Sequence, residues 1–218
     1  IRFFAAWALG SLESKDAGDR VISMLRENDG KDRYLTHAGV VALELIGDRE
    51  FVQQWAGDKS AAVRMAVLLV QRRWSDSRIA QFLDDARLEI VTEAARAIND
   101  LPLTTGRDKL ANLAERFKNA SGENVVPLMR RIINANLQLG SRTNVEAVIG
   151  IATSVKQSTV IRTEAVSALS SWQDPTKRDR VTGFWQPVAA RDPSTVRDVV
   201  QRTASKLLAT SPPDLLVD

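Results

Sequence analysis

Few residues in this chain have the types and spacing that catalysis or metal binding requires. His37 is the only histidine and cysteine is absent, so thiolate chemistry is excluded and a histidine base has no evident partner. Asp84, Asp85 and Glu93 form the densest acidic group, but a metal ion requires further converging carboxylates. We therefore predict no catalytic, metal-binding or cofactor-binding residue, and we assign His37 a structural role.

Two arginine pairs are the first candidates for contact with a partner. Arg72-Arg73 and Arg130-Arg131 both fall within segments whose apolar spacing predicts helices. In a stack of helix pairs, one layer of helices faces a common surface, so these side chains could form a basic stripe. The sequence thus offers Arg72, Arg73, Arg130 and Arg131 as partner-binding residues.

Other arginines fit a structural role better. Arg64, Arg162 and Arg197 each stand early in a predicted helix, and Asp58 and Asp192 precede the first and last of them. A guanidinium in that position needs a carboxylate or carbonyl partner when it is buried. We predict that these three arginines bond groups of the neighbouring repeat.

An irregular charged segment interrupts the pattern between Asp174 and Pro187. Departures from a regular repeat are often where binding surfaces are formed. The segment carries Lys177, Arg178, Arg180 and Trp185, and we predict that these four residues contact a neighbouring domain or another protein. Trp172, just ahead of this segment, is a further tryptophan that could contact a ligand, whereas Trp7, Trp55 and Trp74 fall on or beside apolar stripes, where packing is the default role.

The elements that position these residues follow from a repeated sequence. Arg2–Gly10 reappears as Arg162–Leu169 and, more loosely, as Thr92–Ile98. Further copies begin near Thr36, Arg64, Arg130 and Arg197, which gives a period of roughly 28–38 residues, typical of a helix pair. Ser60, Ser158 and Ser194 precede three of the copies and are suited to cap a helix.

Between these helices lie shorter apolar stripes that predict the first helix of each pair. The stripes fall within 21–25, 51–55, 79–83, 110–117, 145–152 and 181–188. No segment alternates apolar and polar residues for long enough to predict a strand. We predict an all-α fold, an α-α superhelix of about six to seven antiparallel helix pairs.

Composition limits the partners. The net charge is only +3, far from the concentrated positive charge of nucleic-acid-binding domains. No apolar run approaches the roughly 18 residues of a membrane span. Nucleic acid, membrane and small-molecule partners are therefore disfavoured, and protein is the expected partner.

Both ends of the chain lead us to expect a piece of a longer array, residues 1–218 forming one repeat array. Phe3, Phe4 and Trp7 open the chain in mid-repeat, and Leu215–Val217 could begin another helix. Such apolar faces lack cover and tend to find partners. We expect the isolated chain to self-associate weakly.

The repeated helix, with best copies in Ile1–Gly10, Val63–Val70 and Ile161–Leu169, resembles HEAT repeats, especially those of the phycobilisome-lyase type. Glu93–Pro102, Arg131–Gly140 and Arg162–Trp172 also resemble the HEAT segment of large exported bacterial proteins. Those proteins join a sugar-dehydrogenase-like propeller to a cytochrome c domain. The resemblance implies a non-catalytic, extracytoplasmic spacer between a redox domain and a haem domain.

Two alternatives stay open. A free-standing protein-binding adaptor would have the same repeat and lack the flanking domains. A HEAT-like DNA glycosylase would require an acidic residue and aromatics within a strongly basic groove, which a net charge of +3 disfavours.

Overall fold

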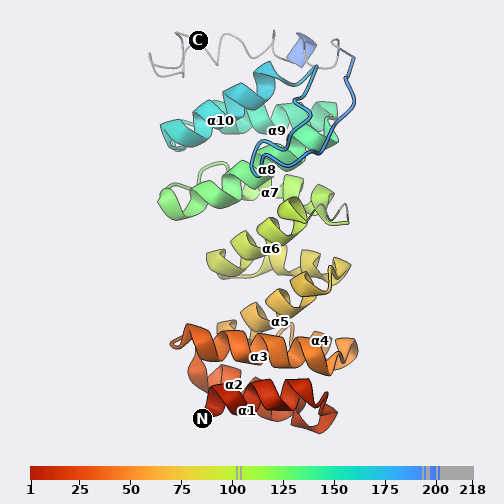
Figure 1. Cartoon of the computed structure of the whole chain (residues 1–218). Helices are drawn as coiled ribbons and strands as arrows, with labels where there is room; N and C mark the ends of the chain where they lie inside the picture. The colour runs from red at the N-terminus through yellow and green to blue at the C-terminus, as the bar shows by residue number, and fades with distance from the viewer. Residues whose placement is uncertain (102, 104, 193, 195–196, 200, 202–218) are drawn as a thin grey trace. The chain divides into compact units, whose positions relative to one another are not determined.

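Helices formed by the predicted apolar stripes make up the computed structural model of this chain (Figure 1). It describes residues 1–101, 103, 105–192, 194, 197–199 and 201. Within these residues there is no strand, only one isolated antiparallel bridge between Arg178 and Trp185. The all-α prediction is confirmed.

The chain forms two compact units, Ile1–Ala94 and Ala95–Asp218. The first unit contains α1 (Arg2–Ser11), α2 (Gly18–Asn28), α3 (Arg33–Ile46), α4 (Arg49–Gln54) and α5 (Ala61–Arg73), with short 3₁₀ helices η1 (Lys15–Ala17) and η2 (Ser77–Asp84). The division falls inside α6 (Leu88–Asp100). The second unit continues with α7 (Arg107–Phe117), η3 (Glu123–Val125), α8 (Val126–Leu139), α9 (Arg142–Ala152) and α10 (Thr159–Ser170).

Close helix packing in the first unit depends on small residues. Helices α1 and α2 both pack on α3. Gly10 of α1 is buried against Ala42 of α3, and a Cβ atom at Gly10 would lie 2.7 Å from the Ala42 Cα atom. The glycine therefore sets how closely α1 approaches α3, because a larger residue would push the two backbones apart.

Five of the six predicted first-helix stripes, those between residues 21 and 152, lie in helices of the structure, with one change of geometry. Ile79, Phe82 and Leu83 are buried as predicted, but they lie in a 3₁₀ helix, η2. Side chains three residues apart eclipse in a 3₁₀ helix, so Ile79 and Phe82 still face the core. The Ser60 and Ser158 caps are also present, since their hydroxyls accept hydrogen bonds from the amides of Val63 and Ile161.

The predicted helix over 181–188 is wrong. After α10 the chain forms an irregular segment, residues 171–192, which we call the strap. Gly183 has a φ of +74° there, and Pro187 provides no amide hydrogen for a helix. The predicted seventh copy near Arg197 and the Leu215–Val217 tail lie largely or wholly outside the described residues.

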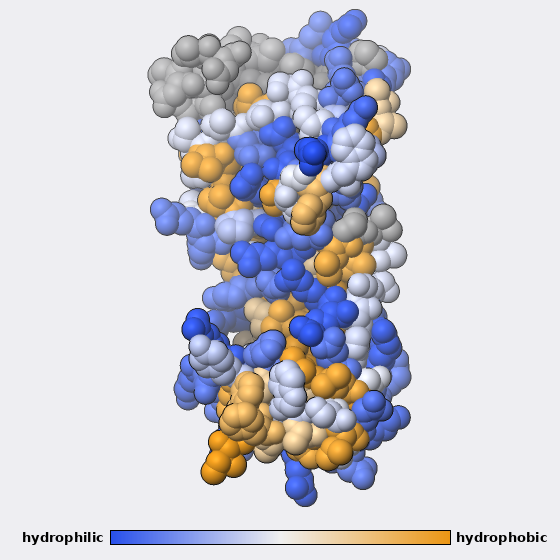
Figure 2. All heavy atoms as spheres, viewed as in Figure 1, coloured by the Kyte–Doolittle hydropathy of each residue, from blue (hydrophilic) through white to orange (hydrophobic). Residues whose placement is uncertain are grey.

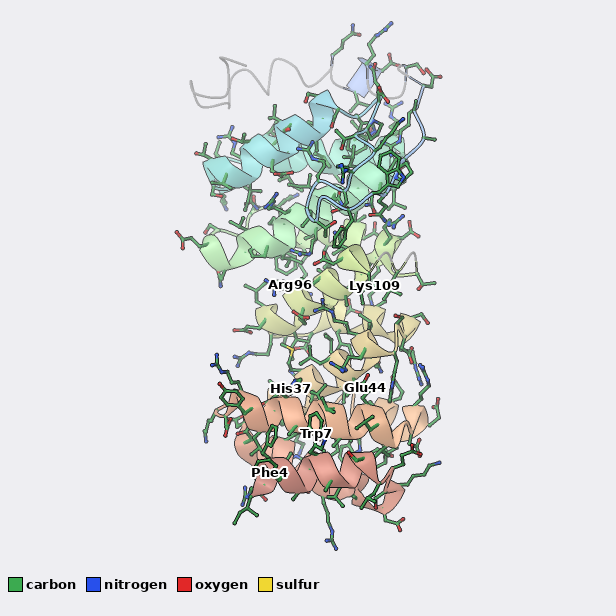
Figure 3. The ribbon with its side chains drawn as sticks, viewed as in Figure 1. Phe4, Trp7, His37, Glu44, Arg96 and Lys109 are labelled. Atoms are coloured by element: carbon green, nitrogen blue, oxygen red, sulfur yellow. The ribbon has the colours of Figure 1, made fainter. Side chains whose placement is uncertain are left out.

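Apolar side chains on α1 remain uncovered in the described structure. Phe4 is 74 % exposed and Trp7 is also exposed; both project from α1 (Figure 3). Phe3 packs against both rings, with centroid distances of 5.3 Å to Phe4 and 6.2 Å to Trp7. Apolar residues gather over α1 in the space-filling view (Figure 2), as expected for this end of the chain.

Helix α10 provides a test of the packing. Ala165 and Ala168 are fully buried, and α10 packs on α8 and α9. Replacing Ala168 with Leu should overpack these contacts and lower the free energy of unfolding by roughly 1–3 kcal/mol. Urea denaturation measures the change, with Thr163→Ala, at an exposed position of the same helix, as the control. An unchanged urea midpoint for Ala168→Leu would show that Ala168 does not lie in a tight interface.

Candidate protein-binding surface

The strap is held against the second unit by a buried carboxylate. Asp179 is 5 % exposed and accepts hydrogen bonds from the side chains of Asn134, at 2.6 Å, and Gln138, at 3.0 Å, both on α8. It also accepts bonds from the amides of Val181 and Thr182 and from the Thr182 hydroxyl. These bonds fix the turn and join it to α8.

A second anchor lies at the end of the strap. The Arg191 guanidinium stacks over the buried Trp172 ring, 5.5 Å from its centroid. It donates to the carbonyl oxygens of Leu137, Gln138 and Trp172, and so caps the C-terminus of α8. Burial lowers the pKa of Arg191 from its ordinary value. The strap is thus attached to packed helices at Asp179, in its middle, and at Arg191, near its end.

Around Asp179, from Lys177 to Gln186, the strap makes a tight hairpin-like turn. The Asp179 amide donates to the Phe184 carbonyl at 2.8 Å, and the Gln186 amide donates to the Lys177 carbonyl at 3.0 Å. These bonds flank the bridge between Arg178 and Trp185. The turn therefore holds Lys177, Arg178 and Trp185 close together on a defined backbone.

The four strap residues predicted to bind a partner line one hollow. Its volume is about 660 Å³, and its lining consists of Glu164 of α10, Thr176, Lys177, Arg178, Asp179, Arg180 and Trp185. Trp185 is 64 % exposed, and the ammonium of Lys177 lies 6.0 Å from its ring centroid. The sequence prediction that they bind a partner stays a prediction, but the structure places these residues at one site.

The cations of the hollow have different roles. Arg180 donates to Glu164 at 3.2 Å and to the Ser167 hydroxyl at 2.8 Å, so it attaches the strap to α10. Arg178 is exposed, and its guanidinium donates to the Gly183 carbonyl at 3.0 Å. Within the described residues neither Lys177 nor Arg178 forms an ion pair with a carboxylate. Two cations and an indole are therefore available to a partner.

All four arginines of the two pairs already form ion pairs with carboxylates of other helices. The ion pairs are Arg72 with Glu93, Arg73 with Glu44, Arg131 with Asp100 at 2.7 Å, and Arg130 with Glu164 at 3.6 Å. Each pair lies within one of the two units. In the structure these arginines thus join helices through ion pairs. Their contact with an external partner remains a prediction.

The structural arginines have buried partners. Arg64 forms a two-bond pair with Asp85, at 2.7 and 3.0 Å, and donates to the carbonyls of Asp58 and Lys59. The Asp58 carboxylate instead pairs with Arg26. The expected role of Arg64 is confirmed, but its carboxylate partner is Asp85 rather than the aspartate just ahead of it.

Arg162 is buried and donates to the Ala152 carbonyl at 3.0 Å. Arg197 is exposed near Asp192, whose pKa lies below its ordinary value chiefly because of hydrogen bonds from Ser194. The expected partner of Arg162 is therefore a carbonyl of the preceding helix, α9.

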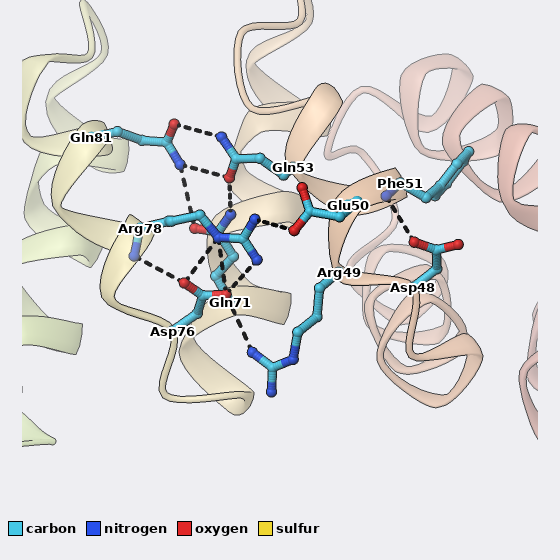
Figure 4. Close-up of polar contacts among 9 residues, drawn as sticks. All are labelled: Asp48, Arg49, Glu50, Phe51, Gln53, Gln71, Asp76, Arg78 and Gln81. Carbon is cyan, nitrogen blue, oxygen red and sulfur yellow. Dashed lines mark hydrogen bonds and ion pairs between the residues drawn. The ribbon is translucent and has the colours of Figure 1, made fainter.

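A polar cluster between α4, α5 and η2 also proves to be structural (Figure 4). Asp76 accepts bonds from Arg78, at 2.8 Å, and from Arg49, at 3.2 Å. Gln53 accepts hydrogen bonds from the side-chain amides of Gln71 and Gln81. The donors and acceptors of the cluster satisfy one another, which is the arrangement of a helix junction.

The acidic residues considered for metal binding do not act together, because two of them pair with different arginines. Asp85 pairs with Arg64, and Glu93 pairs with Arg72. In the described part of the chain, no three histidine, aspartate or glutamate side chains form a possible metal site. His37 lies exposed on α3.

Paired aspartates make the first unit sensitive to acid. The hydrogen bond from Arg78 lowers the pKa of Asp76. Burial raises the pKa of Asp58 and Asp85, but hydrogen bonds from Arg26 and Arg64 outweigh this, so both pKa values lie below the ordinary value. Because the folded pKa is lower than the unfolded value of about 3.9, these pairs stabilise the fold above that pH and lose this effect as pH falls further.

We therefore expect the melting temperature of the full chain to change little between pH 8 and pH 5 and to fall below about pH 4. Circular dichroism melts over this range test the expectation. The variant Asp85→Asn should melt lower at neutral pH and show a smaller decrease on acidification. A melting temperature that rises below pH 4 would contradict the assigned pairs.

No helix within the described residues has the length and apolar character to cross a membrane. The functional residues that sequence reasoning missed are the anchors Asp179 and Arg191 and the hollow's carboxylate, Glu164. The Asp179–Thr182 spacing, typical of a turn closed by an aspartate side chain, was the one local signal.

Comparisons of the chain with protein families, curated proteins and solved structures found no match.

Proposed function

We propose that this chain is a non-catalytic helical scaffold of the HEAT-like type, and that its strap binds a segment of a protein. The partner is a neighbouring domain of a longer polypeptide or a separate protein. In an exported redox protein of the kind the sequence resembles, the chain would act as a spacer between domains. As a free-standing protein, it would act as an adaptor.

One observation carries the binding role. Lys177, Arg178 and Trp185 lie exposed around one hollow, on a turn whose backbone is fixed by Asp179 and Arg191. A surface that is already ordered loses little conformational entropy when a partner binds. An exposed indole beside cations also matches the residue types that dominate protein interfaces.

Ion pairs between helices two apart in chain order support the scaffold role. Glu44 of α3 pairs with Arg73 of α5 in the first unit. Asp100 of α6 pairs with Arg131 of α8, and Arg130 pairs with Glu164 of α10 in the second. Contacts that join each helix only to its neighbours are typical of repeat arrays.

Nucleic acid is the less favoured partner. The net charge is +3, and the four arginines of the helix pairs are engaged with carboxylates. We expect no excision of damaged bases and only weak binding to duplex or single-stranded DNA that is lost by about 200 mM salt. Electrophoretic mobility shifts across a salt series test this expectation. Tight binding that survives this salt concentration would favour the nucleic-acid alternative.

A selection from a random peptide library displayed on phage tests the proposed function. The full chain is the target, and the selected peptides are measured against Trp185→Ala and against Tyr34→Ala, an exposed aromatic of the first unit. We expect peptides whose binding Trp185→Ala removes and Tyr34→Ala leaves intact. Selected peptides indifferent to Trp185→Ala, or no selected peptides, would overturn the assignment of the strap as the binding surface.

A further inference from the structure

We infer that the hollow of the strap binds an acidic peptide segment that also carries an apolar side chain. This inference rests on the proposed function and adds the chemistry of the partner. It follows from the charges left unpaired at the hollow, from the exposed indole and from the way the remaining polar groups are satisfied.

The charge balance of the hollow is positive where a partner has access. The carboxylates of the lining are Glu164, which pairs with Arg180 at 3.2 Å, and Asp179, which is buried and accepts bonds from α8. Lys177 and Arg178 are exposed, and within the described residues no carboxylate pairs with them. The carboxylates of a partner can form ion pairs with these two cations and accept charge-assisted hydrogen bonds from them.

The exposed indole of Trp185 favours a partner that also carries an apolar side chain. Trp185 lines the same hollow as the two cations, and the Lys177 ammonium lies 6.0 Å from its ring. An aliphatic or aromatic side chain that covers the ring would remove apolar surface from water, which favours binding. A segment with an apolar residue between acidic residues can therefore cover the ring and reach both cations.

Phosphate-rich ligands fit this hollow less well. Nonspecific single-strand binding needs a positively charged groove along the nucleic-acid backbone as well as stacking platforms. Here the other cations near Glu164 already interact with it: Arg180 donates hydrogen bonds to it, and Arg130 forms an ion pair with it at 3.6 Å. Only two exposed cations remain, which suits a short run of carboxylates better than a polyanion.

Fluorescence anisotropy with defined probes tests the inference. The main probe is a fluorescein-labelled peptide, Glu-Asp-Leu-Glu-Phe-Asp-Glu. One comparison peptide has Ser in place of Leu and Phe, a second has Lys in place of every acidic residue, and the third probe is single-stranded oligothymidylate. We expect the main probe to bind about tenfold more tightly than the serine peptide, which is 1.4 kcal/mol, and the lysine peptide not to bind.

Paired charge reversals locate the site. Lys177→Glu/Arg178→Glu should weaken binding of the main probe at least about tenfold, as should Trp185→Ala. The control, Lys31→Glu/Lys59→Glu, changes the net charge equally at exposed positions of the first unit and should leave binding unchanged. Arg180 is not altered, because it holds the strap to α10. Circular dichroism melts verify that each variant is folded.

The outcomes distinguish failure of the acidic-apolar partner from failure of the proposed protein-binding function. Equal binding of the serine peptide, preference for the lysine peptide, or equal weakening by both charge reversals would overturn the acidic-apolar partner. If phage selection then still gives peptides that depend on Trp185, the proposed function stands with a different partner chemistry. Oligothymidylate binding that exceeds peptide binding and is lost with Trp185→Ala would overturn both.

Discussion

Replacing Asp179 with Ala is expected to lower the free energy of unfolding by about 3 kcal/mol and to release the strap. The carboxylate accepts five hydrogen bonds, and its donors include Asn134, which is itself buried. A buried donor that loses its acceptor costs about 1–3 kcal/mol. Urea denaturation of the full chain measures the effect.

Asp192→Ala is the matched control for this variant. Asp192 lies in the same strap but is exposed, and it accepts hydrogen bonds from Ser194, one of them from the amide. We expect its loss to change stability by less than about 0.5 kcal/mol. Peptide binding should be lost in Asp179→Ala and retained in Asp192→Ala. Equal stability of the two variants would show that Asp179 is not an anchor.

The second large effect is expected at Arg64. Arg64→Met removes the partner of Asp85, whose side chain is 5 % exposed. Removing one partner of a buried ion pair typically costs about 3–5 kcal/mol. The double variant Arg64→Met/Asp85→Asn should recover much of this loss, because Asn removes the charge but can still accept the hydrogen bond that the Arg87 amide donates to position 85.

An exposed ion pair provides the comparison. Arg2 and Glu27 pair at 3.1 Å with side chains 67 % and 63 % exposed, so Arg2→Met should cost less than about 1 kcal/mol. Chemical denaturation of Arg64→Met, Arg64→Met/Asp85→Asn and Arg2→Met ranks their free energies of unfolding. A cost for Arg64→Met no greater than that for Arg2→Met would contradict the buried pair. So would a double variant as unstable as the single one.

The helices could be predicted from the sequence because their signals are local. The apolar stripes of α5 and α10 and the serine caps Ser60 and Ser158 all lie within one helix length. The strap could not be predicted in this way. Val181, Phe184, Trp185 and Val188 have helical spacing, but the Asp179 side chain bonds the amides of the turn, and such bonds compete with a helix.

Roles that depend on distant partners were also beyond the sequence. Lys177, Arg178 and Arg180 are alike in charge, yet only Arg180 reaches Glu164 on α10. Arg64 pairs with Asp85, 21 positions away, and not with the nearer Asp58 carboxylate. Packing of the helices decides these pairs, and local spacing does not encode it.

The most direct test of the strap as a protein-binding surface is a titration followed through the tryptophan indoles. The chain has five tryptophans, so a ¹⁵N-labelled sample gives five indole N–H signals, and Trp185→Phe identifies the one of interest. Titration with the peptide Glu-Asp-Leu-Glu-Phe-Asp-Glu should shift the Trp185 signal in wild type and not in Lys177→Glu/Arg178→Glu. Shifts confined to other tryptophans, with Trp185 unchanged, would contradict the account.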